Sequence, residues 1–382
     1  MPVTFNFLLL LTLINNIVVR AANIVLVLYA LKLGAEPVTV GLLAATFSFL
    51  PMLVSMPAGK LADRYGALWP LVIGTVGGGL GLLVPYLVPG LAALFVAATL
   101  MGLTSSMHTL LQNMAGLLSP PQTRVRNFSN FSMIMAASSF IGPLIGGFAI
   151  DHYDHATACL QLALLMLAPV AMLIVRSHAF PRGTPQVKHE GGDTRSLLAD
   201  PGVRRMLATS SLLNTGNDLY LFYMPVYANS LGFSATTIGL VLAMFSAAAF
   251  VIRIVLPRLI LRFREEKLLA IALYVSALSL LLIPFTQSAV VLMAISFVFG
   301  LGPGAGQPII TMLMFIQSPQ GRSGEGLGLR MSVVFFTKLV GPLVFGAIGQ
   351  VLGLPPMFWI NSAMLAGGGL LSRAAKKPAA RS

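Results

Sequence analysis

Residues 29–48 read YALKLGAEPVTVGLLAATFS, and residues 227–246 read YANSLGFSATTIGLVLAMFS. The two stretches are 198 residues apart, and half of their aligned positions are identical. At the same offset, Arg20 aligns with Asp218, so two apolar segments carry opposite charges at equivalent positions. This pattern indicates a chain made of two repeated halves, and it places Arg20 and Asp218 in or beside a central cavity.

The composition is that of a protein embedded in a bilayer. Apolar residues make up 57% of the chain and charged residues 9%, whereas a soluble domain carries about 25% charged residues. The mean hydropathy is +0.87. The single cysteine, Cys159, excludes an internal disulfide and gives no information about the redox compartment.

Twelve apolar segments are each long enough to cross the hydrocarbon core as a helix, and they lack the alternation of barrel strands. They cover residues 5–31, 38–58, 69–88, 91–118, 128–150, 156–178, 205–230, 235–257, 268–285, 289–317, 326–352 and 356–373. We therefore expect an all-α integral membrane protein with twelve transmembrane helices in two pseudo-symmetric bundles. The N-terminal bundle is expected over 1–178, a cytoplasmic linker over 179–204 and the C-terminal bundle over 205–382.

The basic residues predict the orientation. With the N-terminus in the cytoplasm, the connections and the tail on that side hold 19 of the 24 Lys and Arg residues, and the outer loops hold only Lys32. Such a bias is typical of inner-membrane proteins, and it predicts that both termini are cytoplasmic. The net charge of +13 is then explained by topology and lipid attraction, without a nucleic-acid partner.

Two motifs resemble those of the major facilitator superfamily, and the resemblance covers essentially the whole chain. Residues 59–66 read GKLADRYG, between the second and third segments, and are similar to the family's G-x-L-a-D-r-x-G loop signature. Ala67 and Leu68 replace the basic pair that usually follows. The resemblance implies alternating access and a gating contact of Asp63 with the eleventh helix. The candidate gating residues in this region are Gly59, Asp63, Arg64 and Gly66.

The fifth segment carries SSFIGPLIGG at 138–147, which is similar to the pattern g-x-x-x-G-P-x-x-G-G of antiporters in that superfamily. Its candidate gating residues are Gly142, Pro143, Gly146 and Gly147. Proline permits a kink, and the glycines permit close helix contact. Simple small-residue packing is the alternative, since GPLVFG recurs at 341–346, at an offset of 199. The fourth segment lacks the arginine that many drug exporters of the superfamily carry.

Charged residues at depth need an explanation, because a charge in hydrocarbon is unfavourable by at least about 2.5 kcal/mol. Arg20, Asp218 and Lys338 are predicted to lie about 20 Å inside their spans. Asp218 is either a structural counter-ion of Arg20 or Lys338, or the carrier of a coupling proton. Arg253 and Arg330 lie near the cytoplasmic ends of their spans, where their side chains can snorkel. Arg330 is also a candidate gating residue.

Further polar residues gather on the first, fourth, seventh and tenth segments, which line the cavity in this superfamily. The candidate residues of the substrate and proton pathway are Arg20, Asp218, Asn16, Asn23, His108, Gln112, Asn214, Asn217, Gln307 and Lys338. Gln307 aligns with His108 at the offset of 199. Residues 302–308, GPGAGQP, are expected to break or bend the tenth helix.

These observations predict a proton-coupled efflux transporter of the cytoplasmic membrane. The alternatives are an importer or facilitator of a small polar or anionic solute, and a non-transporting membrane sensor. We find no metal-ligand cluster, nucleophile–base pair or phosphate-binding loop, so we expect neither an enzyme nor a cofactor or metal. The expected partners are a small-molecule substrate, protons and lipid, and the chain is expected to be a monomer.

Overall fold

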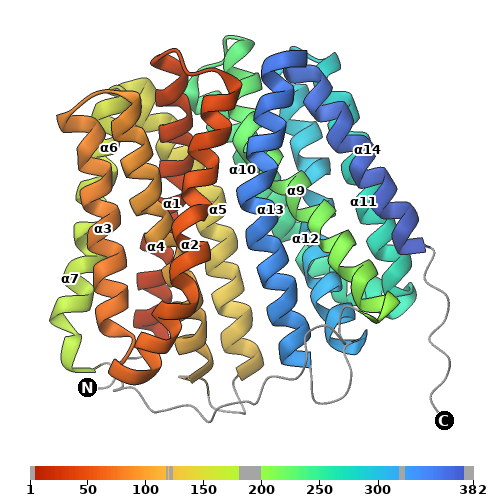
Figure 1. Cartoon of the computed structure of the whole chain (residues 1–382), viewed down its shortest axis with the longest axis horizontal. Coiled ribbons are helices and arrows are strands. Elements are labelled where there is room, and N and C mark those ends of the chain that lie inside the picture. Colours follow the sequence, from red (N-terminus) through yellow and green to blue (C-terminus); the bar gives the residue numbers. More distant parts are fainter. Residues whose placement is uncertain (1–4, 118, 120–123, 180–198, 318–322, 374–382) are drawn as a thin grey trace. The chain divides into compact units, whose positions relative to one another are not determined.

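The structure is a computed structural model, and it describes residues 5–117, 119, 124–179, 199–317 and 323–373. In this part of the chain all regular elements are helices (Figure 1). In the N-terminal half they are α1 (Phe5–Lys32), α2 (Pro37–Tyr65), α3 (Leu68–Leu87), α4 (Leu91–Leu117), α5 (Arg124–His152), α6 (His155–Leu165), α7 (Leu167–Val175) and the 3₁₀ turn η1 (Ser177–Ala179).

The C-terminal half repeats this order. It contains α9 (Pro201–Ser230), α10 (Ala235–Arg262), α11 (Glu265–Leu282), the 3₁₀ turn η2 (Ile283–Phe285), α12 (Ala289–Gln317), α13 (Ser323–Leu352) and α14 (Leu354–Arg373). Since α6 and α7 together make one span over 155–175, the twelve predicted segments are all found. The fold class predicted from the sequence is confirmed.

Ten of these helical segments are long and apolar enough to cross a membrane, counting only described residues. The two that fall short are α9 and α14. Helix α9 carries Asn214, Asn217 and Asp218 within its length, and α14 contains two prolines, an asparagine and three consecutive glycines. The helix with the weakest apolar character in the C-terminal half therefore includes the acid that the sequence singled out.

The ends of α1 and α9 show the repeat at the level of single hydrogen bonds. Gly34 and Gly232, which align at the offset of 198, have φ values of 81° and 79°. The amide of Ala35 donates to the Ala30 carbonyl, and that of Phe233 donates to the Ala228 carbonyl. This is the same glycine-dependent C-cap at both positions, so the sequence repeat corresponds to a repeat of backbone conformation.

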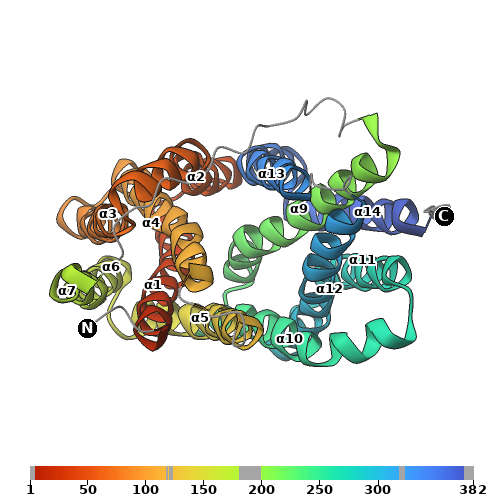
Figure 2. The same cartoon turned by 90° about the horizontal axis from the view of Figure 1, so that it is seen from below.

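The described helices form two compact units. The first contains α1 to α7 together with 222–243 and 342–350, and the second contains α11, α12, α14 and the remaining parts of α9, α10 and α13. In the first unit α1 packs mainly on α5, and α4 packs on α2 and α3. In the second, α11 lies beside α12 and α14 (Figures 1 and 2). The expected linker over 179–204 falls largely on residues 180–198, which lie outside the described residues.

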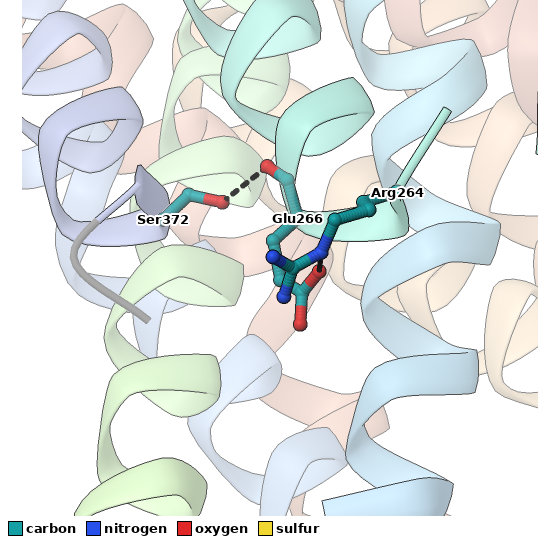
Figure 3. Close-up of polar contacts among 3 residues, drawn as sticks. All are labelled: Arg264, Glu266 and Ser372. Carbon is teal, nitrogen blue, oxygen red and sulfur yellow. Dashed lines mark hydrogen bonds and ion pairs between the residues drawn. The ribbon is translucent and has the colours of Figure 1, made fainter. Parts of the chain in front are cut away.

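Polar contacts fix two helix starts. Asp154 precedes α6 and accepts a hydrogen bond from the Thr157 amide at 2.6 Å. This bond outweighs the opposing effect of burial and holds the pKa of the Asp154 carboxyl below its ordinary value. At the start of α11, Arg264 Nε lies 3.7 Å from Glu266 Oε2, and Ser372 of α14 donates to the Glu266 carbonyl at 3.0 Å (Figure 3). The second contact ties α14 to α11.

Two local expectations need correction. The signature at 59–66 does not form a loop, because α2 continues to Tyr65 and only Gly66, with a φ of 92°, makes the turn. The side chains of Gly59, Asp63 and Arg64 lie outside the described residues. Residues 302–308 do not break their helix, because α12 is helical throughout and its glycines serve close packing. A Cβ on Gly304 would lie 2.7 Å from the Ala249 Cα.

Candidate functional site

The polar face expected on α1 lies near its crossing with α5. Asn16 is buried, and its Nδ2 donates to the Thr12 carbonyl at 2.9 Å. Arg20 and Asn23 are half-buried. A Cβ added to Gly142 of α5 would lie 2.5 Å from the Arg20 Cβ. The Arg20 side chain therefore leaves α1 at the point where the backbones of α1 and α5 are in close contact.

The antiporter-like pattern on α5 produces contacts with two helices. A Cβ on Gly146 would lie 2.7 Å from Ile24 Cγ2 of α1, and one on Gly147 would collide with the Ala235 carbonyl of α10. In the opposite sense, a Cβ on Gly239 of α10 would lie 2.5 Å from the Pro143 carbonyl. Glycine is needed at these positions because the helix backbones touch.

The first unit contains a second crossing of the same kind. A Cβ on Gly41 of α2 would collide with the Pro342 carbonyl of α13. Gly41 and Gly239 align at the offset of 198, and Pro143 and Pro342 align at 199. The α2–α13 and α5–α10 crossings are thus equivalent in the repeat. Tyr223 strengthens the first of them, since its hydroxyl donates to the Pro342 carbonyl at 2.7 Å.

The end of α5 also holds the start of α10. The Asp151 carboxylate accepts hydrogen bonds from the amides of Ala235 at 3.0 Å and Thr236 at 2.7 Å. These amides have no partner within their own helix, and a negative charge at a helix N-terminus is favourable. At the equivalent position of the repeat, the Gln350 amide donates to the Glu36 carboxylate.

The two candidates on α4 have different surroundings. The His108 ring stacks on Phe131 of α5, with 5.7 Å between ring centroids and an interplanar angle of 26°. Gln112, one turn further on, is exposed. Phe131 belongs to a buried apolar cluster that includes Leu8, Leu11 and Leu173. We call this group the Phe131 cluster.

In the second unit, four polar side chains from three helices form a continuous network. Arg330 of α13 donates from Nε to Ser210 Oγ at 3.0 Å and from Nη2 to Gln307 Oε1 at 2.8 Å. Gln307 of α12 donates from Nε2 to Asn214 Oδ1 of α9 at 2.8 Å. Asn214 donates in turn to the Ser210 carbonyl at 2.7 Å. We call these four residues the Arg330 network.

The network corrects one prediction. Arg330 does not snorkel out of its span, because its side chain is turned into the second unit and is only 6% exposed. Arg253, its expected companion, is exposed. Sequence analysis missed Ser210, although it aligns with Thr12 of α1 at the offset of 198. That alignment was the available signal.

Asp218 is buried in α9, with 7% exposure, and the Asn217 amide donates to its Oδ1 at 3.3 Å. Lys338 of α13 is half-buried. Arg20 belongs to the first unit and Asp218 to the second, so their pairing stays a prediction. Of the sequence-predicted candidates, the structure brings Asn214, Gln307 and Arg330 together.

The model of one family, the Major Facilitator Superfamily, matches this chain over residues 8–315 and 215–381. The chain belongs to the major facilitator superfamily. Among its relatives are an uncharacterised transporter of this superfamily from Methanocaldococcus jannaschii, 19% identical over 87% of this chain and 88% of the relative, and the quinolone resistance protein NorA of Staphylococcus aureus, 25% identical over 90% and 89%.

The solved structures agree on the fold of the superfamily. The nucleoside transporter NupG superposes with a TM-score of 0.84 at 12% identity, over 97% of this chain and 99% of that one. As a member of this superfamily the chain is a multi-pass membrane transporter, and the solved structures show the major facilitator fold. Its substrate is a small molecule, and its helices lie in lipid.

Proposed function

We propose that this transporter exports a small molecule across the cytoplasmic membrane by alternating access, in exchange for protons. It acts as a monomer in the inner membrane, with both termini in the cytoplasm. Export is supported by the relationship to NorA, which is named for quinolone resistance and aligns with nine tenths of this chain.

The observation that carries proton exchange is the buried Asp218 carboxyl. Acidic residues inside transmembrane segments are rare because of their desolvation penalty, and they mark proton relays. Asp218 lies on α9 next to Asn217 and one turn after Asn214, which belongs to the Arg330 network. The sequence repeat aligns Asp218 with Arg20. Moving this cation away during the cycle would let the carboxyl bind one proton, and bringing it near would release that proton.

The glycine-based crossings support the conformational part of the proposal. At the α5–α10 and α2–α13 crossings the contact is made by backbone atoms of Pro143, Gly239, Gly41 and Pro342. Close backbone contact at small residues allows packed helices to slide or rock. The proposed gating residues are Gly142 and Gly146, where α5 meets α1, Pro143 and Gly147, where α5 meets α10, Arg330 on α13, and Gly59, Asp63, Arg64 and Gly66 at the end of α2.

The proposed pathway for substrate and proton follows the polar residues of both units. It comprises Asn16, Arg20, Asn23, His108, Gln112, Asn214, Asn217, Asp218, Gln307 and Lys338. Each proton that enters as substrate leaves draws on the membrane potential, which supplies about 2.3 kcal/mol per charge for every 100 mV.

The test is proton-linked transport by the purified chain in proteoliposomes, across a panel of candidate compounds. We expect Asp218→Asn to reduce transport driven by a pH gradient at least tenfold, while substrate-for-substrate exchange persists. Glu265→Gln, an acid at the start of α11, is the matched control and should leave both rates unchanged. Unaltered pH dependence in Asp218→Asn would remove Asp218 as the proton carrier.

Import of an anionic solute is the second candidate. Arg330 supports the anionic character of that solute, because a buried cation suits a negatively charged substrate. Everted membrane vesicles separate the two directions. Export predicts that acidifying the vesicle interior drives uptake of the substrate into these vesicles. Uptake that instead follows an acidic exterior would support import.

A further inference from the structure

The guanidinium of Arg330 has unused hydrogen-bond donors. An arginine side chain carries five N–H groups, and two of those of Arg330 are used by Ser210 and Gln307. Within the described part of the chain, the other three have no partner. The two bonds that are made fix the plane of the guanidinium, so the direction of the unused edge is fixed as well.

The two partners of Arg330 carry no charge, since they are a hydroxyl and an amide. Among the residues whose side chains the structure describes, none forms an ion pair with Arg330. A buried charge is strongly unfavourable unless an opposite charge neutralises it. Arg330 is only 6% exposed, so binding of a negatively charged group next to its guanidinium would be strongly favourable.

The repeat shows that the fold does not need this arginine. At offsets of 198 and 199, Ser210, Asn214, Gln307 and Arg330 correspond to Thr12, Asn16, His108 and Phe131. Asn16 donates to the Thr12 carbonyl as Asn214 does to the Ser210 carbonyl. The asparagine bond thus belongs to both halves, whereas the first half places an aromatic ring where the second half places a cation.

We propose that the Arg330 network is a binding site for the carboxylate or phosphate group of an anionic ligand. The unused edge of the guanidinium offers two parallel N–H donors, the geometry in which arginine binds carboxylates and phosphates. The neighbouring Gln307 and Ser210 hold the guanidinium in place before the ligand arrives, so little side-chain entropy is lost on binding.

The ligand is the anionic group of the transported molecule. Only this last assignment rests on the proposed export function; the site itself rests on the contacts of Arg330. Because the side chain is almost completely buried, the site accepts one compact head group, and the rest of the molecule extends away from it.

The experiment measures equilibrium binding to the purified full-length chain in phosphatidylcholine nanodiscs, without a proton gradient, by calorimetry. The probes are benzoate, inorganic phosphate and benzamide, which is neutral and close to benzoate in shape. We expect benzoate or phosphate to bind at least tenfold more tightly than benzamide. Arg330→Gln should weaken anion binding at least tenfold, and Arg330→Lys should weaken it less, because charge remains while the fork is lost.

Arg253→Gln is the matched control, since Arg253 is an exposed arginine of α10, and the anion affinity of this variant should equal that of the wild type. If Arg330→Gln fails to fold, Ser210→Ala serves instead, because it removes only the Nε partner and should still lower the affinity. Equal affinity of wild type and Arg330→Gln for the anions, or no anion binding by the wild type, overturns the proposal.

Phosphatidylglycerol nanodiscs distinguish a solute from a lipid head group as the source of the anion. If solute anions bind equally well in both lipids, the site serves a solute; if phosphatidylglycerol blocks them in an Arg330-dependent manner, the same site takes a lipid phosphate. The export proposal is tested separately, because a chain that binds benzoate but shows no proton-driven transport retains the site and loses only that function.

Discussion

The Phe131 cluster and the Arg330 network lie at equivalent positions of the two halves, yet their chemistry is opposite. The first unit buries leucines and methionines around Phe131, and the second hydrogen-bonds Arg330 to Ser210 and Gln307. The same helix ends and the same asparagine bond recur in both. The backbone of the repeat is therefore retained while its interior has diverged, so the polar residues of the second unit are not required to build the fold.

Two more pairs of equivalent positions are apolar in the first unit and polar in the second. Leu11 and Leu173 of the cluster correspond to Thr209 and Ser372, which are also completely buried. The serine and threonine hydroxyls bond to backbone carbonyls of Glu266 and Arg205. At these two positions the first unit thus buries apolar side chains, and the second buries hydroxyls that are hydrogen-bonded.

The largest effect is expected when an arginine, as found at position 330 of the second unit, replaces the equivalent Phe131 of the first unit. Phe131→Arg should destabilise the chain by about 4 kcal/mol or more, because the new charge would lie among leucines and methionines. Phe131→Leu, the control, keeps the site apolar and should be much milder. Thermal unfolding of detergent-solubilised protein gives the comparison. If Phe131→Arg were tolerated as well as Phe131→Leu, the first unit would not be an apolar counterpart at all.

An exchange at the next pair should give a smaller but unequal response. Leu173→Ala is expected to cost about 2–5 kcal/mol, since it opens a cavity in a packed core. Ser372→Ala is expected to cost about 0.5–1.5 kcal/mol, since it removes one hydrogen bond to Glu266. The measurement is the unfolding midpoint of both variants side by side. Equal losses would show that the two halves are stabilised in the same way.

Tyr223→Phe is expected to have the smallest effect. Its hydroxyl bond to Pro342 is present at the α2–α13 crossing, whereas the equivalent position on α1 is Val25. Loss of one buried hydrogen bond should lower stability by about 1 kcal/mol, and Tyr153→Phe, at an exposed tyrosine between α5 and α6, is the control. A shift for Tyr223→Phe no larger than that of the control would mean that the hydroxyl adds nothing to this crossing.

The sequence predicted the helices well, because each span is a long apolar run and two separate stretches repeat at nearly the same offset. The observed starts and ends differ from the expected ones mainly by extension: α2 runs through the signature to Tyr65, and α10 runs on to Arg262. Charged residues at these ends were interpreted as loops, although helices commonly continue beyond the hydrocarbon into the interface.

The candidate site was predicted only in part. Depth along a span follows from counting residues, so Asn214, Gln307 and Asp218 were identified from position alone. The direction of a side chain depends on helix rotation and on neighbouring partners, and this is why Arg330 was expected to reach the interface but turns toward Ser210. Asp151 and Tyr223 bond to backbone atoms of distant helices, and such partners leave no residue pattern in the sequence.

The Asp151 contact has a consequence for how this chain tolerates mutation. Its carboxylate recognises peptide amides at 235 and 236, and amides are present whatever side chains those positions carry. Over evolutionary time, the side chains of the first turn of α10 are free to change without loss of its attachment to α5. The Asp151 carboxylate alone is enough to preserve this contact while the surrounding surface changes.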